Sequence, residues 1–376
     1  MNLGTFLDDA AAKYGEHPYI RFDEETLSFR EFQRQVLVLA HALKDLGFGP
    51  GDFIHVLVQN SPATIVAYAA IQRIGAVAGP INGWWKAPEV EYLLNDSKGC
   101  GLIVEAQYLP IFNEIKGKCP HLKKVIEVSE KPSEGHISFA SLLAEAADPP
   151  SASDADTEDI AFIFYTSGTT GNPKGVLLSN KNVVADANGI NAALNTAENR
   201  NFLCFLPLFH VNAMLTCTSS MQKGHQIVLR KAFSASEFWE VVEKYKINFW
   251  SAVPAVYQIL LTDPSRQKYD LSSMEFGICG AAPLTEETMR NFEKTFNIPI
   301  VEGYGLTETS PVIAVSNFEK NGVEFGTVGP PLKNVNVRIA DDGEIQCKGP
   351  NVMKGYYKDA EQTQSVTTED GWFKTG

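Results

Sequence analysis

One stretch of the chain combines the residue types that bind phosphate groups. Residues 165–176 read Tyr-Thr-Ser-Gly-Thr-Thr-Gly-Asn-Pro-Lys-Gly-Val. Glycines let the backbone approach a phosphate and aim N–H groups at it, while hydroxyls and the Lys174 ammonium add donors. The stretch is not a Walker A loop, because that motif needs glycine where Pro173 stands, and it does not fit the GxGxxG fingerprint. These residue types predict an oligophosphate site, with an ordinary Ser/Thr/Gly-rich turn as the alternative on composition alone.

Further motifs along the chain favour the phosphate site. Residues 165–176 resemble the phosphate loop of the adenylate-forming superfamily, which includes acyl-CoA synthetases, luciferases and the adenylation domains of peptide synthetases. Later segments resemble further motifs of that family, in the family's order. Residues 207–210 (Pro-Leu-Phe-His) resemble its substrate gate, and 280–284 (Gly-Ala-Ala-Pro-Leu) resemble its adenine-side loop. Residues 302–308 (Glu-Gly-Tyr-Gly-Leu-Thr-Glu) resemble its nucleotide and magnesium motif, and its last elements are matched by 343–344, 355–356 and 371–376. The resemblance covers essentially the whole chain.

The resemblance implies a reaction. In this family a substrate carboxylate attacks the α-phosphorus of ATP, magnesium pyrophosphate leaves, and the thiol of coenzyme A captures the acyl-adenylate. Three residues would be catalytic: Glu308 would hold Mg²⁺ through a hard carboxylate oxygen, Thr307 would donate to the α-phosphate, and Lys174 would contribute positive charge at the phosphates. Tyr304 would lie against the adenine. The implied nucleotide-binding residues are Thr166, Ser167, Gly168, Thr169, Thr170, Gly171, Lys174, Gly280, Ala281, Ala282, Glu302, Gly303, Tyr304 and Thr307.

The residues at the substrate gate narrow the class of acid. Adenylation domains for amino acids carry an Asp directly after the gate phenylalanine, and this chain has His210 there. No carboxylate follows in residues 211–214, so a substrate ammonium would be desolvated without a partner. The implied acid-binding residues are His210, Val211, Asn212, Gly280, Pro311 and Val312. We expect activation of a medium- or long-chain fatty acid. The alternatives are an aryl or other small-acid CoA ligase and a nucleotide- or acyl-binding module without turnover.

Hydrophobic periodicity predicts the elements that position these residues. Phe32, Val36, Leu39 and Leu43 recur at helical spacing, and helices and strands then alternate: strand 53–58, helix 63–74, strand 76–81, helix 89–95, strand 101–105 and a buried strand 160–165 before the phosphate loop. This alternation predicts an α/β fold with two packed, mostly parallel sheets. Short alternating segments beyond Gly326 predict a small β-barrel-like part.

We expect a single AMP-binding N-terminal domain over residues 1–376. Its first α/β lobe would span about 1–200, its second 201–325 and its β-rich part 326–376. In the family, the chain continues after the motif at 371–376 into an Asp that holds the ribose, a hinge and a C-terminal lobe. That lobe carries a lysine which contacts the carboxylate and the α-phosphate. With the C-terminal lobe absent, we expect the chain alone to be inactive or strongly impaired.

Composition excludes several partners. The 376 residues include 32 Lys and Arg against 45 Asp and Glu, which gives a formal charge of −13 and argues against a nucleic-acid or polybasic membrane partner. No apolar stretch approaches the ~20 residues of a membrane span, and the N-terminus lacks the features of a secretory signal. Six scattered cysteines form no metal-binding pattern, so buried, inert thiols are expected. We predict a cytoplasmic enzyme without stable membrane insertion.

Two adjacent tryptophans depart from the family's pattern. Trp84 and Trp85 stand where members of the family have smaller or polar residues. Exposed tryptophans can mark a partner or lipid surface, but such large apolar side chains more often pack under a neighbouring loop. We expect both side chains to be buried.

Overall fold

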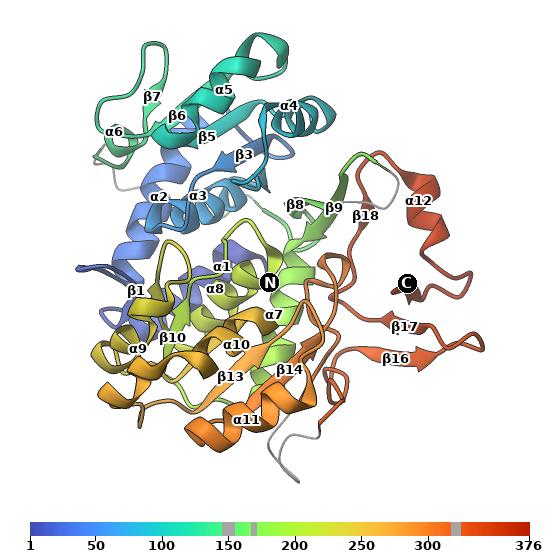
Figure 1. Ribbon diagram of the computed structural model, residues 1–376. Helices are drawn as coiled ribbons and strands as arrows, with labels where there is room; N and C mark the ends of the chain where they lie inside the picture. The colour runs from blue at the N-terminus through green and yellow to red at the C-terminus, as the bar shows by residue number, and fades with distance from the viewer. Residues whose placement is uncertain (145–154, 167–170, 317–324) are drawn as a thin grey trace.

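A computed structural model describes residues 1–144, 155–166, 171–316 and 325–376. Its framework is two eight-stranded sheets and one three-stranded sheet (Figure 1). In both large sheets the central strand pairs are parallel and antiparallel pairs lie toward the edges. The predicted α/β class with two mostly parallel sheets is confirmed.

The first large sheet contains the strands predicted in the N-terminal part of the chain, in the upper half of Figure 1. Its strand order is β18 (Gly355–Tyr356), β9 (Lys174–Ser179), β8 (Ile160–Thr166), β4 (Val77–Pro80), β3 (Phe53–Leu57), β5 (Gly101–Glu105), β6 (Lys124–Val128) and β7 (Ile137–Ser138). The strands predicted at 53–58, 76–81, 101–105 and 160–165 are all present within two residues at either end.

The second large sheet lies in the lower half of Figure 1. Its strand order is β15 (Ala314–Val315), β14 (Ile300–Tyr304), β13 (Phe276–Cys279), β12 (Phe249–Ala252), β10 (Asn201–Cys204), β11 (Gln226–Leu229), β1 (Pro18–Phe22) and β2 (Glu25–Ser28). Successive residues on these strands face different cores, because side chains alternate across a sheet: Phe202 and Cys204 face one core, and Leu203 faces the other.

Helices form one layer between the two sheets and one layer on each outer face. The central core joins residues of both sheets to α1 (Leu3–Tyr14), α2 (Phe29–Asp45), α3 (Pro62–Arg73), α7 (Asn180–Leu194) and α8 (Val211–Lys223). The outer cores are closed by α4 (Ala87–Asp96) and α5 (Leu109–Ile115) on the first sheet, and by α9 (Ala235–Lys244), α10 (Pro254–Thr262) and α11 (Glu286–Phe296) on the second. Both α7 and α8 therefore pack between the sheets, beside the predicted site.

The C-terminal part forms an open sheet instead of the expected barrel. Its described strands, β16 (Asn336–Ile339), β17 (Ile345–Lys348) and β19 (Phe373–Lys374), pair antiparallel in a single three-stranded sheet. Two short helices, α6 (Phe139–Ala144) near β7 and α12 (Ala360–Ser365) after β18, complete the described helical elements. Three strands of two to four residues are too few to close a barrel, which explains the difference from the expectation.

Strand pairing links the parts of the chain that the sequence predicted as separate lobes. Strands β1 and β2 pair within the second sheet although they precede residue 200, and β18 pairs with β9 of the first sheet although it follows residue 325. The division at residues 200 and 325 therefore stays a prediction about domains. All six cysteines are buried and free, as predicted. No helix in the described part of the chain is long and apolar enough to cross a membrane.

Candidate active site

A cavity of about 550 Å³ opens at the carboxyl edge of the second sheet, where ligands of open α/β sheets usually bind. The structure brings most of the described predicted site residues together in its wall: Thr166, His210, Val211, Asn212, Gly280, Ala281, Gly303, Tyr304, Thr307, Glu308, Pro311 and Val312. Four predicted residues, Gly171, Lys174, Ala282 and Glu302, are not among its lining residues. Ser167, Gly168, Thr169 and Thr170 lie outside the described residues.

The two ends of the predicted phosphate loop are held opposite each other by a hairpin. Strands β8 and β9 pair antiparallel, and Thr166 pairs with Lys174 at the end of the ladder. Gly171 has a backbone φ of +113°, a conformation that residues with a side chain rarely adopt. The hairpin therefore fixes the start of the loop beside the cavity and presents Lys174 at its other end.

The nucleotide and magnesium motif turns sharply after β14. Gly305 is required at this turn, because a Cβ there would lie 1.9 Å from the carbonyl oxygen of Pro311. A short helical turn over Thr307–Thr309 follows, in which the Thr309 hydroxyl accepts the backbone N–H of Leu306 at 2.9 Å. This compact turn places Thr307 and Glu308 at one end of the cavity and Pro311 further along its wall.

A buried asparagine from the C-terminal part braces the same turn. The Asn351 amide donates to the carbonyl oxygens of Thr309 at 3.0 Å and Val312 at 2.8 Å. In return, the Ser310 hydroxyl donates to the backbone carbonyl oxygen of Asn351 at 2.7 Å. Because Asn351 is fully buried, these bonds satisfy groups that water cannot reach. Nothing in the local sequence around residue 308 signals this partner, which is about forty residues away.

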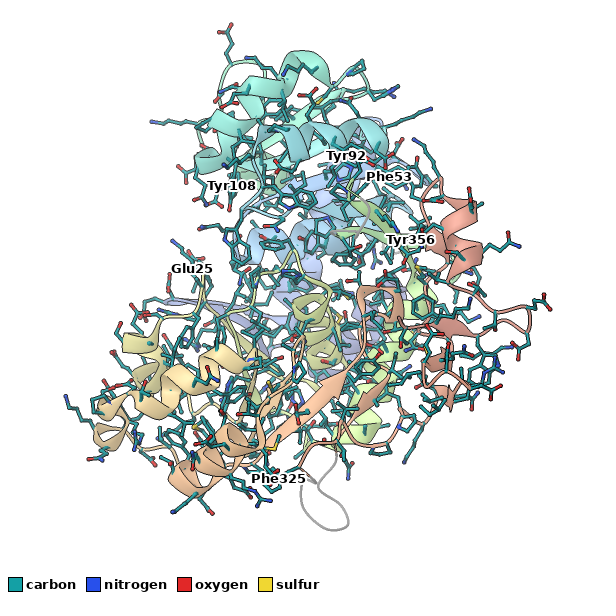
Figure 2. The ribbon with its side chains drawn as sticks, turned by 45° about the vertical axis from the view of Figure 1, so that its right-hand side comes forward. Glu25, Phe53, Tyr92, Tyr108, Phe325 and Tyr356 are labelled. Atoms are coloured by element: carbon teal, nitrogen blue, oxygen red, sulfur yellow. The ribbon has the colours of Figure 1, made fainter. Side chains whose placement is uncertain are left out.

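Tyr356 on β18 links the candidate metal ligand to the phosphate loop. Its hydroxyl donates to Glu308 Oε1 at 2.8 Å, and Lys174 Nζ lies 5.5 Å from the centre of its ring. Burial and the nearby Glu308 charge raise the pKa of the Tyr356 phenol, which therefore remains a donor at neutral pH. Figure 2 labels Tyr356 where the C-terminal part meets the first sheet. Lys174 does not line the cavity, but it lies beside the ring of Tyr356, whose hydroxyl contacts the lining residue Glu308.

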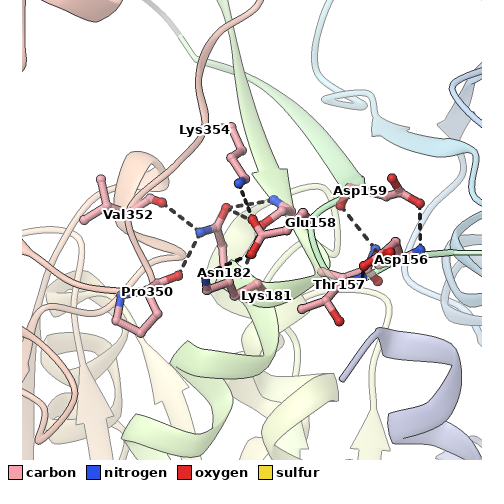
Figure 3. Close-up of polar contacts among 11 residues, drawn as sticks. Asp156, Thr157, Glu158, Asp159, Lys181, Asn182, Pro350, Val352 and Lys354 are labelled. Atoms are coloured by element: carbon pink, nitrogen blue, oxygen red, sulfur yellow. Dashed lines mark hydrogen bonds and ion pairs between the residues drawn. The ribbon is translucent and has the colours of Figure 1, made fainter.

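Polar contacts hold the segment that carries Asn351 and Tyr356 against α7 (Figure 3). The Asn182 amide donates to the carbonyl oxygens of Pro350 and Val352, each at 2.8 Å. Lys354 forms an ion pair with Glu158, whose other oxygen lies 2.9 Å from Lys181 Nζ. Ser179 caps the start of α7 and so fixes Asn182 in the first turn. The C-terminal segment is therefore positioned by the helix that also forms the cavity wall.

Two residues of the motif have structural partners that the sequence did not reveal. The buried Glu302 carboxylate accepts the backbone N–H of Leu284 at 3.2 Å and so ties β14 to the adenine-side loop. Burial raises the pKa of Glu302. The Tyr304 hydroxyl donates to the Thr375 hydroxyl at 2.9 Å, while the residue itself lines the cavity. Glu302 therefore supports the nucleotide end from behind its wall.

Aromatic side chains surround the gate residue His210. Its ring lies 4.8 Å from that of Phe209, which in turn contacts Trp84 edge-on at 5.3 Å between ring centres. Trp84 is 74% exposed, so the expectation of burial is wrong for this residue, whereas Trp85 packs partly buried against α4 and α5. Trp84 lies at the surface, in edge-on contact with Phe209 beside the gate. Desolvation lowers the pKa of His210, which keeps its imidazole neutral at pH 7.

Away from the nucleotide motif, the cavity is mainly apolar. It runs between the second sheet and helices α7 and α8, and the side chains lining this section include Ile190, Leu194, Phe202, Leu206, Leu215, Phe249 and Val315. Asn212 contributes one polar group, and its Oδ1 accepts the Ser251 hydroxyl at 3.2 Å. One continuous cavity therefore joins the nucleotide motif to a space suited to a hydrocarbon group.

The residues present fit a magnesium ion that arrives with a nucleotide. Among the described residues, no three His, Cys, Asp or Glu side chains are grouped to hold a metal by themselves. Mg²⁺ needs no such cage, since it commonly binds one or two carboxylates together with substrate phosphates and water. Tyr356 occupies Oε1 of Glu308, and no described residue is hydrogen-bonded to Oε2. Oε2 would therefore be the oxygen that holds the ion.

Comparison with known proteins identifies the family of the chain. Residues 7–357 match the sequence model of the AMP-binding enzyme family. The chain therefore belongs to this family, as the order of its motifs predicted.

Relatives of similar sequence are acid–CoA ligases. The long-chain-fatty-acid–CoA ligase of Bacillus subtilis is 30% identical, with 100% of this chain aligned to 73% of that protein. The indoleacetate–CoA ligase of Aromatoleum aromaticum is 31% identical, with 100% of this chain aligned to 75% of that protein. The 4-coumarate–CoA ligase 2 of Petroselinum crispum is 31% identical, with 94% of this chain aligned to 68% of that protein. Fatty-acid and aryl-acid ligases are thus equally similar to this chain.

Solved structures show the same fold. The N-terminal domain of FACL13 from Mycobacterium tuberculosis superposes with a TM-score of 0.91 at 26% identity, covering 100% of this chain and 95% of that one. A long-chain-fatty-acid–CoA ligase from Archaeoglobus fulgidus superposes with a TM-score of 0.90 at 26% identity. The superposition covers 100% of this chain and 81% of that one. The described architecture is that of the N-terminal domain of these enzymes.

Proposed function

We propose that the protein activates a carboxylic acid with ATP and transfers the acyl group to coenzyme A, and that the acid is a medium- or long-chain fatty acid. The observation that carries this proposal is the continuity of the cavity, which begins at Thr307 and Glu308 and continues into an apolar section between α7, α8 and the second sheet. An acyl-adenylate needs such a space, because its nucleotide and its hydrocarbon group are joined by one covalent bond.

The reaction joins two anions, so the site must orient them and balance their charge. Thr307 donates its hydroxyl to the α-phosphate, and Tyr304 and the loop at Gly280 and Ala281 form the wall for the adenine. Glu308 would hold Mg²⁺, and the ion would supply positive charge that balances the phosphates. The chain needs no nucleophile of its own, because the substrate carboxylate attacks phosphorus and the coenzyme A thiol attacks the adenylate.

The charges in the cavity favour an acid without an amino group. Glu308 is the single carboxylate among the described lining residues, and it lies with the nucleotide motif. A substrate ammonium near His210 would lose its hydration without gaining a carboxylate partner. The apolar side chains beyond the gate support a hydrocarbon substituent, and their arrangement serves an alkyl chain or an aromatic ring. The equal similarity to fatty-acid and aryl-acid ligases keeps the aryl acid as the second candidate.

The test is acid-dependent exchange of labelled pyrophosphate into ATP, followed by thioester formation with coenzyme A. It uses the protein extended through the C-terminal lobe that the family carries, because the chain alone is expected to be inactive or strongly impaired. Saturated acids of graded length and aryl acids such as phenylacetate and cinnamate form the substrate panel. We expect exchange with alkyl acids to exceed exchange with aryl acids. The opposite order favours the aryl-acid ligase. Binding of nucleotide without exchange in the presence of any acid would leave only the binding module.

A further inference from the structure

The far end of the acid cavity is polar, although its middle is apolar. Phe249 begins β12 and Val253 follows its end, and both line the cavity, so the cavity extends along four residue steps, or about 13 Å, of strand. The nucleotide motif lies at the carboxyl edge of the sheet. At the amino edge the wall includes Thr196 and His225, which precede β10 and β11, with polar side chains of α7 and α8 nearby: Asn191, Thr216 and Ser219.

The hydrogen bonds of His225 leave a free donor on Thr196. The backbone N–H of Arg200 donates to His225 Nδ1 at 3.1 Å, so this nitrogen carries no proton. Burial lowers the pKa of His225 to about 3, so the ring is neutral and its proton is on Nε2. Nε2 lies 3.2 Å from Thr196 Oγ1 and therefore donates to it. The Thr196 hydroxyl accepts this bond, and its own hydrogen is available to a group inside the cavity.

Asn191 supplies an acceptor at the same end. Both hydrogens of its amide are used, because Nδ2 donates to the Ser219 carbonyl at 3.0 Å and to Gln222 Oε1 at 2.6 Å. In the described part of the chain, no group donates to Asn191 Oδ1. Asn191 itself is 8% exposed, and it lines the cavity. A donor and an acceptor thus stand at the end of an otherwise apolar channel.

The charge pattern defines what kind of group suits this end. No lysine or arginine is among the described lining residues, and the single lining carboxylate, Glu308, is at the opposite end. A terminal carboxylate or ammonium on the substrate would therefore be desolvated without an ionic partner. A terminal methyl group would leave the Thr196 hydrogen and Asn191 Oδ1 without partners. A hydroxyl group both accepts and donates, so it is the neutral group whose chemistry matches both partners.

We propose that the preferred acid carries a neutral hydroxyl group at the end distant from its carboxylate, and that Thr196 donates to this hydroxyl while Asn191 accepts from it. The inference rests on the proposed function and refines its substrate class to hydroxylated acids. Thr196 and Asn191 are specificity residues here, because they contact the substrate far from the reacting atoms. His225 is a positioning residue, since it acts by orienting the Thr196 hydroxyl.

The experiment uses non-hydrolysable acyl-sulfamoyl adenosines in matched pairs, one member ending in a methyl group and the other in a hydroxyl group. Alkyl pairs of graded length and an aryl pair are included, and affinity is measured by calorimetry with the protein. For the pair whose length reaches Thr196, we expect the hydroxyl member to bind about tenfold more tightly, which is the effect of one net hydrogen bond of about 1.4 kcal/mol.

The matched variants are Thr196→Val, Asn191→Leu and Thr218→Val. Thr218 is the control, because its buried hydroxyl donates to the Met214 carbonyl at 3.0 Å and it is not a lining residue. We expect Thr196→Val and Asn191→Leu to abolish or reverse the preference for the hydroxyl member by tightening the methyl member, and Thr218→Val to preserve it. Tighter binding of the methyl member shows that a variant is folded.

The outcomes separate this inference from the proposed function. If the methyl members bind as tightly as their hydroxyl partners at every length, the inference is overturned while the acid–CoA ligase function stands. If Thr196→Val retains the full hydroxyl preference, the assignment of Thr196 is overturned with it. If neither member of any pair binds, both proposals are wrong.

Discussion

Tyr356 provides a direct test of how Glu308 is positioned. Its hydroxyl donates to Glu308 Oε1 at 2.8 Å, and the raised pKa of the phenol keeps this donor protonated at neutral pH. Tyr356→Phe removes the donor and keeps the ring that Lys174 Nζ approaches at 5.5 Å. The substitution therefore changes the orientation of the carboxylate with little change in packing.

The magnitude follows from the kind of bond removed. A hydrogen bond to a charged group contributes about 1.5–3 kcal/mol, which corresponds to a factor of about 10 to 100 in an equilibrium constant. The bond holds the Glu308 carboxylate with Oε2 available for the metal. In the protein extended through the C-terminal lobe, we expect the Mg²⁺ concentration at half-maximal pyrophosphate exchange to rise about tenfold in Tyr356→Phe. The effect on the maximal rate should be smaller, because excess metal compensates for a less ordered ligand.

The control is Tyr357→Phe, which removes a hydroxyl from the next residue. The Tyr357 hydroxyl lies 3.5 Å from the Ser97 carbonyl, and its ring packs on Phe53 at 5.0 Å, outside the cavity. Thermal unfolding of both variants checks that each is folded. The reasoning is refuted if Tyr356→Phe is folded and shows the same Mg²⁺ dependence as the parent and Tyr357→Phe.

Four other predictions follow from the same structure. In the protein extended through the C-terminal lobe, Lys174→Ala should weaken pyrophosphate exchange by about one to two orders of magnitude, since a charge-assisted bond to phosphate is lost; unchanged exchange counts against the loop assignment. Glu308→Gln should abolish Mg²⁺-dependent exchange with little change in unfolding temperature, and near-parental turnover at saturating Mg²⁺ contradicts it. Asn351→Ala should lower the free energy of unfolding in urea by about 2–5 kcal/mol, because two buried carbonyls lose their donor; a loss below ~1 kcal/mol would be inconsistent with the bracing role. Burial lowers the pKa of His55 to about 4 in the folded protein, compared with the ordinary value of 6.5 in the unfolded chain. Between pH 6.5 and about 4, the unfolded chain therefore binds a proton on His55 that the folded protein does not bind. Stability should therefore fall as pH decreases below about 6.5, by up to ~1.4 kcal/mol per unit, and His55→Asn should flatten this slope in denaturant titrations at several pH values.

The sequence predicted the α/β core well because its elements have strong local signals. Phe32, Val36, Leu39 and Leu43 recur at helical spacing, and all four are fully buried on α2. The strands of the first sheet are short apolar runs bounded by turns, which is typical of buried parallel strands. The C-terminal part was predicted less well, because β16, β17 and β19 are short and half-exposed, and their pattern does not distinguish an open sheet from a barrel.

The site shows the same division between local and distant signals. Motif order predicted Thr307, Glu308 and Pro311 as site residues, and the structure brings all three to the wall of one cavity. It could not reveal that Glu302 supports the adenine-side loop from behind, because only the fold brings its carboxylate to the N–H of Leu284. Burial of Trp84 was predicted from the general behaviour of tryptophan, which does not reveal that this side chain is exposed and contacts Phe209.

The C-terminal segment 350–356 contacts residues 308–312 of the cavity wall and the start of α7. Tyr356 holds Glu308 at the nucleotide end, and Asn351 holds the backbone at Val312, whose side chain lines the acid section. Asn182 fixes this segment to α7, and α7 also carries Asn191 at the far end of the cavity. Helix α7 thus connects, through Asn182 and segment 350–356, the residue that we propose binds the metal to Asn191, which we propose recognises the substrate's distal hydroxyl. If both proposals hold, the acid length that fits best depends on contacts among residues far apart in the sequence, and not on any one motif.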